Sequence, residues 1–221
     1  MANYNPSITT SSAVSINKVL RNTYMLLSMT LLFSALTAVI SMMVQVGPGI
    51  SLACSFGALA LIWLVLPRTA NSSAGIGVVF AITGLLGFGL GPILNNYLAL
   101  SNGSEIIATA LGGTGVIFLA LSGYVLTTRK DFSFMGGFLM VGLIIVLLAA
   151  VANIFFMIPA LSLAVSGAII LVMSGLILYD TSRIIHGGET NYVLATIGLY
   201  LNIYNIFISL LQILGIFGGD E

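Results

Sequence analysis

Residues 161–183, LSLAVSGAIILVMSGLILYDTSR, form one apolar run that is long enough to cross a lipid bilayer as a helix. The hydrocarbon core of a bilayer is about 30 Å thick, and a helix needs about 20 residues to span it. Before Asp180 the run holds no ionisable side chain except Tyr179. A carboxylate in such a position costs free energy unless a partner, water or a proton compensates for it. The stretch therefore predicts a transmembrane helix and makes Asp180 a candidate functional residue.

The composition of the whole chain is that of a membrane protein. Of its 221 residues, 59% are hydrophobic and only 5% are charged, whereas a soluble domain has about 25% charged residues. Six basic and six acidic side chains give a net charge of zero, which argues against nucleic acid as a partner. One cysteine cannot form an intrachain disulfide, and one histidine with one cysteine is too few for the usual zinc site. We expect no cofactor.

Apolar runs of this kind recur along the chain and are joined by short connectors that contain turn-forming residues. We predict an all-α integral membrane protein with a single domain over residues 1–221, in which residues 1–20 are a flexible cytoplasmic tail. The predicted transmembrane helices cover residues 24–45, 50–67, 75–98, 105–127, 134–157, 161–183 and 192–216. In the third of them, glycines at 77, 84 and 91 predict a small-residue face for close helix packing.

The basic residues predict the orientation of the chain. Connectors on the cytoplasmic side of a membrane carry an excess of Lys and Arg. If the N-terminus is cytoplasmic, all six basic residues fall on that side: Lys18, Arg21, Arg68, Arg129, Lys130 and Arg183. With seven spans, the C-terminus then lies outside the cytoplasm.

The seventh span carries the strongest polar pattern inside the membrane. Gly198, Asn202, Asn205, Ser209 and Gln212 are spaced three or four residues apart, which places them on one helical face. We call these five residues the polar stripe. A helix with such a stripe is expected to be central in the bundle. The stripe either forms interhelical hydrogen bonds, each contributing about 0.6 kcal/mol, or lines a conduit, and the sequence leaves both interpretations open.

Asp180 also has two interpretations. It follows Ser162 by 18 residues, or about 27 Å of helix at 1.5 Å per residue, so it lies near the inner boundary of the membrane. There it could form an ion pair with Arg183, one turn away, at an ordinary helix end. Alternatively, the carboxylate could be dry in one conformation and wet in another, as a gate residue would be.

An enzyme is difficult to build from these residues. An intramembrane serine protease needs a base beside its serine, but the one histidine, His186, lies in a glycine-rich loop. An intramembrane aspartyl protease needs two neighbouring aspartates, and the predicted spans offer only Asp180. We therefore expect no enzymatic activity.

Four segments in order resemble the Bax inhibitor family, the transmembrane Bax inhibitor motif proteins. They are TGLLGFGLGPI at 83–93, VANIFF at 151–156, LILYDTSRIIHGGE at 176–189 and LYLNIYNIFISLLQILG at 199–215. The similarity covers the whole chain, and its size and short termini are most similar to the bacterial branch. The resemblance implies an integral protein of the bacterial inner membrane.

The resemblance also implies a passive calcium leak that responds to pH. In the family, the pH sensor is a pair of aspartates, one in the sixth helix and one in the seventh. An arginine at the end of the second helix lies beside them. These positions fall on Asp180, Asn202 and Arg68 in this sequence, so the second aspartate is replaced by an amide. Supporting positions would be Arg183 and the remaining polar side chains of the stripe, Asn205, Ser209 and Gln212.

This replacement changes what we expect of the gate. Two close carboxylates repel each other and titrate together, whereas the amide of Asn202 can donate a hydrogen bond to an ionised Asp180. We expect the pH response to be weakened or shifted toward acid, and selectivity for Ca²⁺ to be poor, since Ca²⁺ prefers several carboxylate oxygens. The alternative function is that of a regulatory interaction protein. Some bacterial relatives are associated with modulating the membrane protease FtsH and eukaryotic ones with suppressing cell death, and the N-terminal tail could bind such a partner.

Overall fold

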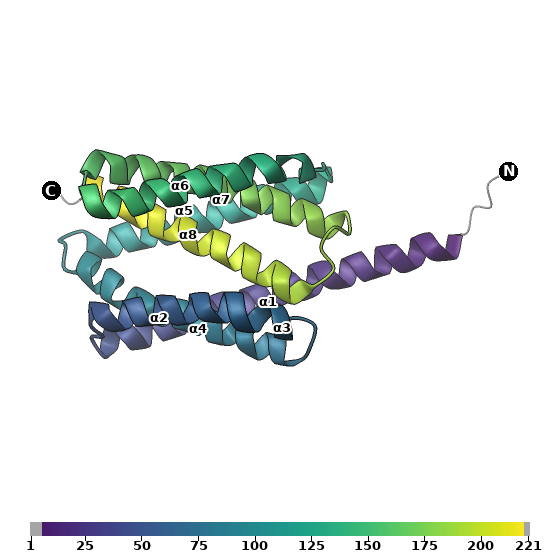
Figure 1. Cartoon of the computed structure of the whole chain (residues 1–221), viewed down its shortest axis with the longest axis horizontal. Coiled ribbons are helices and arrows are strands. Elements are labelled where there is room, and N and C mark those ends of the chain that lie inside the picture. The colour runs from purple at the N-terminus through teal and green to yellow at the C-terminus, as the bar shows by residue number, and fades with distance from the viewer. Residues whose placement is uncertain (1–5, 219–221) are drawn as a thin grey trace.

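The computed structural model describes residues 6–218, with side chains described from residue 14 onward. In this part of the chain every regular element is helical (Figure 1). The α-helices are α1 (Pro6–Met43), α2 (Pro48–Ala60), α3 (Leu66–Thr69), α4 (Ala74–Leu98), α5 (Gly103–Thr128), α6 (Gly136–Phe156), α7 (Pro159–Ile185) and α8 (Tyr192–Gly218). Seven helical stretches are long and apolar enough to cross a membrane, which confirms the predicted number and order of spans.

The second span, Pro48–Thr69, is made of three consecutive helical pieces. A π-helical segment, Leu61–Val65, joins α2 to α3, and Pro67 follows it at the start of α3. Proline has no N–H group, and its ring collides with the carbonyl of the residue four positions before it. The wider π turn accommodates this proline within a continuous span.

The first helix is longer than the sequence predicts. It begins at Pro6, and the apolar span that could cross a membrane begins at Val14. Residues 6–20, expected to belong to a flexible tail, are therefore helical, while residues 1–5 lie outside the described part. Proline is favoured in the first turn of a helix, and no glycine or further proline interrupts residues 7–43. The N-terminal end of α1 projects away from the other helices (Figure 1).

Helix α8 lies at the centre of the bundle, as the sequence predicts. It runs between a group made of α1, α2 and α4 and a group made of α5, α6 and α7 (Figure 1), and it packs against α1, α4, α5 and α7. Of its most apolar stretch, 61% is buried inside the protein, compared with 11% for the span that contains α6. Side chains on both faces of α8 are buried, including Leu199, Asn202 and Ile206.

Glycines on α4 allow α1 to approach closely, and the prediction of a small-residue face is confirmed in part. A Cβ atom at Gly84 would lie 2.7 Å from the ring of Phe33 on α1, and one at Gly91 would overlap Ser41. Gly87, one turn from Gly84, lies directly against Ser34 in the same way. Gly77 has open space beside it and takes no part in this contact.

The alternation of the spans brings all six basic residues to the same end of the bundle, which we call the basic end. The connections there are α3–α4, α5–α6 and α7–α8, and the last of them contacts the other two. The side-chain amide of Asn191 donates to the carbonyl of Ala70 at 3.0 Å and to the side chain of Asn71 at 2.8 Å. The connections α1–α2, α4–α5 and α6–α7 lie at the opposite end.

Candidate functional site between α7 and α8

Asp180 on α7 and Asn202 on α8 form a hydrogen-bonded pair near the basic end. The amide nitrogen of Asn202 donates to Oδ2 of Asp180 at 2.8 Å, and the side chain of Asn202 is buried. Gly198 lies one turn before Asn202, and a Cβ atom at that position would be 3.4 Å from the same oxygen. The absence of a larger side chain lets the carboxylate lie close to the α8 backbone. The structure thus brings together the two residues predicted to carry the gate.

Arg183 does not pair with Asp180, so the ion pair considered as an alternative does not form. Its guanidinium lies 3.7 Å from the carboxylate of Glu189 and donates to the carbonyl of Gly188 at 2.9 Å. It also lies over the ring of Tyr179, 5.5 Å from the centroid. The side chain follows the turn after α7 toward water instead of reaching along the helix into the apolar interface.

Arg68 is not part of the pair either. Its guanidinium donates to the carbonyl of Leu64 within its own span. Among the residues that the structure describes, Asp180 has no ion-pair partner. The neutral amide of Asn202 is the group that compensates for the carboxylate. The arginine position implied by the resemblance is therefore exposed at the end of α3 and does not contact the pair.

The polar stripe of α8 faces α7. Besides the contact of Asn202 with Asp180, Gln212 bonds two serines of that helix: its amide nitrogen donates to Ser162, and its oxygen accepts from Ser166 at 2.7 Å. Of the two interpretations of the stripe, this geometry is that of interhelical hydrogen bonding. The other two polar members contribute less, since Asn205 donates to the carbonyl of Leu201 in its own helix and Ser209 is buried.

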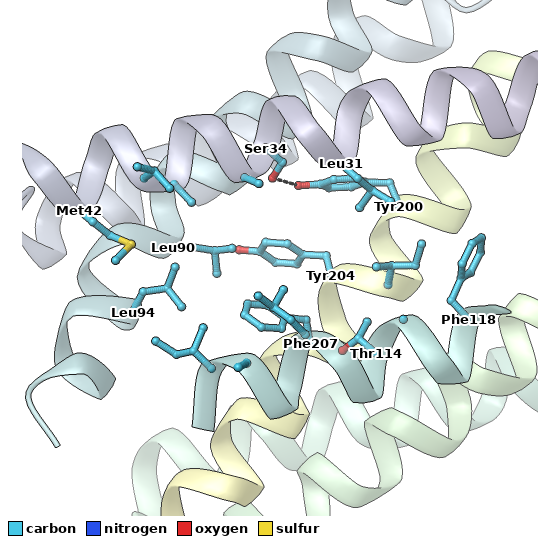
Figure 2. Close-up of a pocket in the computed structure, with 18 of the residues that line it drawn as sticks. Leu31, Ser34, Met42, Leu90, Leu94, Thr114, Phe118, Tyr200, Tyr204 and Phe207 are labelled. Carbon is cyan, nitrogen blue, oxygen red and sulfur yellow. Dashed lines mark hydrogen bonds between the residues drawn. The ribbon is translucent and has the colours of Figure 1, made fainter. Parts of the chain in front are cut away.

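The structure contains a second polar group on α8 that the sequence analysis missed. The hydroxyl of Tyr200 lies 2.6 Å from that of Ser34 on α1 and donates to the carbonyl of Thr83 on α4 at 3.3 Å. Tyr204 stacks on Tyr200, with ring centroids 6.1 Å apart, and reaches toward the carbonyl of Leu86. Figure 2 shows Tyr200 extending from α8 to Ser34 on α1, and Tyr204 extending toward Leu90 on α4. Their spacing of four residues in an apolar helix is the signal that could have revealed them.

A network at the basic end connects the α5–α6 connection to the end of α7. The backbone N–H of Phe132 donates to the hydroxyl of Ser182 at 2.9 Å, and the ring of His186 lies 3.1 Å from the carbonyl of Arg129. Hydrogen bonds from the hydroxyl and backbone N–H of Ser133 lower the pKa of Asp131 below its ordinary value. These contacts fix the position of α6 relative to α7 outside the apolar spans.

The described part of the chain contains no cluster of metal-binding side chains. Within residues 6–218, no three side chains of the types His, Cys, Asp or Glu gather where they could hold an ion together. Asp180 has an amide, a glycine and apolar side chains as neighbours on α8, so it is an isolated oxygen ligand. A hard cation at this position would have to keep most of its water molecules.

Known proteins resemble this chain over nearly its full length. The family model described as "Inhibitor of apoptosis-promoting Bax1" matches residues 16–219. The chain is 54% identical over 211 residues to "Modulator of FtsH protease YccA" of Escherichia coli strain K12, and this alignment covers 95% of each chain. It is equally similar to "Inner membrane protein YccA" of Escherichia coli O6:H1 and 52% identical over 205 residues to an uncharacterized membrane protein of Vibrio cholerae, an alignment that covers 93% of this chain and 92% of that one.

These relatives and the seven apolar helices agree on the location of the protein. One relative is named an inner membrane protein, another a membrane protein, and the spans of this chain are long enough to cross a bilayer. The expectation of an integral protein of the bacterial inner membrane is confirmed. The resemblance inferred from four segments of the sequence is confirmed as well, because the family model covers all four of them. The chain belongs to the Bax inhibitor family.

Proposed function

We propose that the protein is a membrane-embedded regulator of an FtsH-type protease. The observation that carries this proposal is its 54% identity, over 95% of both chains, to the Escherichia coli protein named as a modulator of that protease. A regulator needs a stable transmembrane surface but no catalytic residues of its own, and we include the absence of enzymatic activity in the proposal.

The orientation of the chain belongs to this proposal. We assign the basic end to the cytoplasm, because cytoplasmic connectors are those enriched in Lys and Arg, and all six basic residues of the chain lie at that end. The N-terminus is then cytoplasmic and the C-terminus lies on the other side. A protein whose N-terminus is cytoplasmic can present its first residues to a partner on the same side.

The N-terminal part of α1 is the candidate contact with the protease. Residues 6–13 continue the helix beyond the apolar span, and they project from the bundle (Figure 1). Because the segment lies outside the apolar span, we propose that it binds the protease. We define it as the N-terminal arm.

The test measures how fast an FtsH-type protease degrades a membrane substrate in the same vesicles. We expect the full-length chain to lengthen the half-life of the substrate, and a chain lacking residues 1–13 to lose much of this effect. A chain lacking residues 219–221, at the opposite end, is the matched control and should act as the full-length chain does. Equal half-lives with and without the full-length chain would contradict the proposal.

A cation leak, with Ca²⁺ as the permeant ion, is the second candidate function. The observation that favours it is the pair of Asp180 and Asn202, a carboxylate inside a span with no ion-pair partner in the described residues. In this proposal Asp180 is the gate residue, and the amide of Asn202 keeps the pH response weak. Flux of Ca²⁺ into liposomes tests it directly. Wild type should leak weakly and Asp180→Ala should differ from it, while equal background flux in both would exclude a leak through this site.

A further inference from the structure

A large cavity lies between α1 and α5, away from the pair of Asp180 and Asn202. Its volume is about 600 Å³, and its walls come from α1, α4, α5 and α8. The floor is formed by the α8 side chains Tyr200, Tyr204 and Phe207, which Figure 2 shows between the surrounding helices. Sites for small molecules typically have volumes of about 300–1,000 Å³. The cavity is thus large enough to bind a ligand.

The cavity opens sideways toward the hydrocarbon of the membrane. The backbones of α1 and α5 do not approach each other closely in the described chain, and the rings of Tyr24 and Phe118 meet between them with centroids 6.0 Å apart. Two residues that line the cavity from these helices, Val39 and Leu111, are 50% and 57% exposed, and both lie within apolar spans. A side chain exposed at that depth faces lipid. The entrance between α1 and α5 is therefore bounded by lipid tails and not by water.

The lining of the cavity is suited to an apolar ligand. Its hydroxyl groups already have partners inside the protein: Ser34 pairs with Tyr200, Thr114 donates to the carbonyl of Ala110 at 2.7 Å, and Tyr204 points to the carbonyl of Leu86. The other lining side chains at this depth are apolar. A buried water needs two to four polar partners, and the cavity does not offer them. Water and hydrated ions are thus poor occupants.

The dimensions of the cavity match a single chain of lipid better than a protein segment. Its α5 wall runs from Ser104 to Phe118, which is about 21 Å at 1.5 Å per residue. A helix of about 10 Å diameter and that length would need about 1,600 Å³, which is more than the cavity holds. The cavity is therefore too small to enclose a helix from a second copy of the protein.

One end of the cavity lies near the opposite end of the bundle. It is lined by Met42 near the end of α1, Leu98 at the end of α4 and Ser104 at the start of α5, and all three lie at the opposite end of the bundle. From there it extends past the midplane of a hydrocarbon core of about 30 Å. A lipid whose headgroup stays at this surface could place one tail along the cavity.

We propose that the cavity binds one acyl chain of a phospholipid from the leaflet at the opposite end of the bundle. The acyl chain enters between α1 and α5 and packs against Tyr204 and Phe207. The site differs from the pair of Asp180 and Asn202 and does not depend on the proposed function. The bound lipid fills the space between α1 and α5 and packs against α8.

Photochemical labelling tests the proposal. The full-length protein is placed in vesicles of phosphatidylethanolamine and phosphatidylglycerol, with a small fraction of a phosphatidylethanolamine that carries a diazirine near the end of one acyl chain. After irradiation, labelled residues are identified by mass spectrometry. We expect labels on Thr114 and Phe207, which are buried and line the cavity, in addition to labels on lipid-facing residues such as Phe138 and Phe155.

Matched variants distinguish binding in the cavity from contact with bulk lipid. Ala108→Phe fills the α5 wall of the cavity and should reduce labelling of Thr114 and Phe207 about tenfold, because the acyl chain loses buried contacts. Ala120→Phe lies on the same helix outside the cavity and should change nothing. If Ala108→Phe does not fold, Ala35→Phe fills the cavity from α1 instead. The proposal is overturned if wild type is labelled on lipid-facing residues only, or if a folded cavity-filling variant keeps the labels on Thr114 and Phe207.

Discussion

The amide of Asn202 donates a 2.8 Å hydrogen bond to the carboxylate of Asp180, and this bond connects the central helix α8 to α7 at the depth where α7 leaves the apolar region. The acceptor is the carboxylate of Asp180, and the donor is the neutral amide of Asn202. A second carboxylate in place of the amide could form this contact only by sharing a proton, whereas the amide donates its own N–H. The pair therefore joins the two helices without a shared proton.

Removing the amide should destabilise the protein. In Asn202→Ala the Asp180 carboxylate loses its donor while it stays between α7 and α8, and we expect the free energy of unfolding to fall by about 1–3 kcal/mol. Asn205→Ala is the matched control, since the amide of Asn205 donates to the carbonyl of Leu201 in its own helix. Denaturant unfolding in detergent measures both variants, and an equal loss in the two would refute the role of the pair.

Replacing the amide by a carboxylate should introduce a response to pH. In Asn202→Asp two carboxylates face each other across the distance that the hydrogen bond now occupies, and both cannot be ionised without repulsion. We expect the flux of Ca²⁺ into liposomes to change steeply between about pH 6 and about pH 8 in this variant and weakly in wild type. A steep wild-type response near neutrality that survives Asp180→Asn would show that the sensor lies elsewhere.

Gln212 and Ser166 should be energetically coupled. The oxygen of Gln212 accepts the hydroxyl of Ser166 at 2.7 Å between α8 and α7. A double-mutant cycle with Gln212→Ala and Ser166→Ala should give a coupling of about 0.6 kcal/mol and at most about 1.7 kcal/mol, the average and the maximum for hydrogen bonds inside a membrane bundle. A cycle of Gln212→Ala with Ser122→Ala serves as the control, because Ser122 bonds Thr181 instead. Strict additivity in the first cycle would mean that the contact contributes nothing.

The glycines of α4 should differ sharply in their tolerance of alanine. A methyl group at Gly87 would overlap the backbone oxygen of Ser34 and the hydroxyl of Thr37, so α1 and α4 would have to separate. We expect Gly87→Ala to lower the free energy of unfolding by about 1–3 kcal/mol. Gly77→Ala, on the same helix with open space around it, should be neutral or stabilising. Thermal unfolding of both variants measures the difference, and similar melting temperatures would count against close packing at Gly87.

Asp131 should make part of the stability depend on pH outside the membrane. Hydrogen bonds from Ser133 lower the pKa of Asp131 from its ordinary value of 3.8 in the folded protein. A carboxyl with a lowered folded pKa stabilises the fold above its unfolded pKa, and this contribution is lost as the pH falls through the folded pKa. The melting temperature of wild type should therefore fall more steeply below about pH 4 than that of Asp131→Asn. If the melting temperatures of wild type and Asp131→Asn fell in parallel with pH, Asp131 would not contribute to the acid sensitivity of the fold.

The spans could be predicted from the sequence because the bilayer sets their length. Runs such as 161–183 are apolar over the thickness of the hydrocarbon, and the structure places α7 over the same residues with two more at each end. The central position of α8 could also be predicted, since amides at 202 and 212 must be shielded from lipid. The helical start of α1 was not predicted, because residues 6–20 are polar and polarity alone does not tell a projecting helix from a disordered tail.

The partners of single side chains could be predicted only in part. The pairing of Asp180 with Asn202 followed from the resemblance to the family. The partner of Arg183 is Glu189, six residues later, and this contact depends on how the chain turns after α7. The periodicity of α8 shows which residues share a face, but not which neighbouring helix they meet. That the polar stripe faces α7 is decided by the packing of the whole bundle.

The central position of α8 has a consequence for biosynthesis. It is the last span to leave the ribosome, it is the least apolar of the seven, and both groups of helices pack against it. A nascent chain that ends before Tyr192 lacks the helix against which both groups pack, and its Asp180 still lacks Asn202. Completion of the bundle therefore waits for α8, and a product truncated between Asp180 and Asn202 carries an unshielded carboxylate by which quality control can distinguish it from the finished molecule.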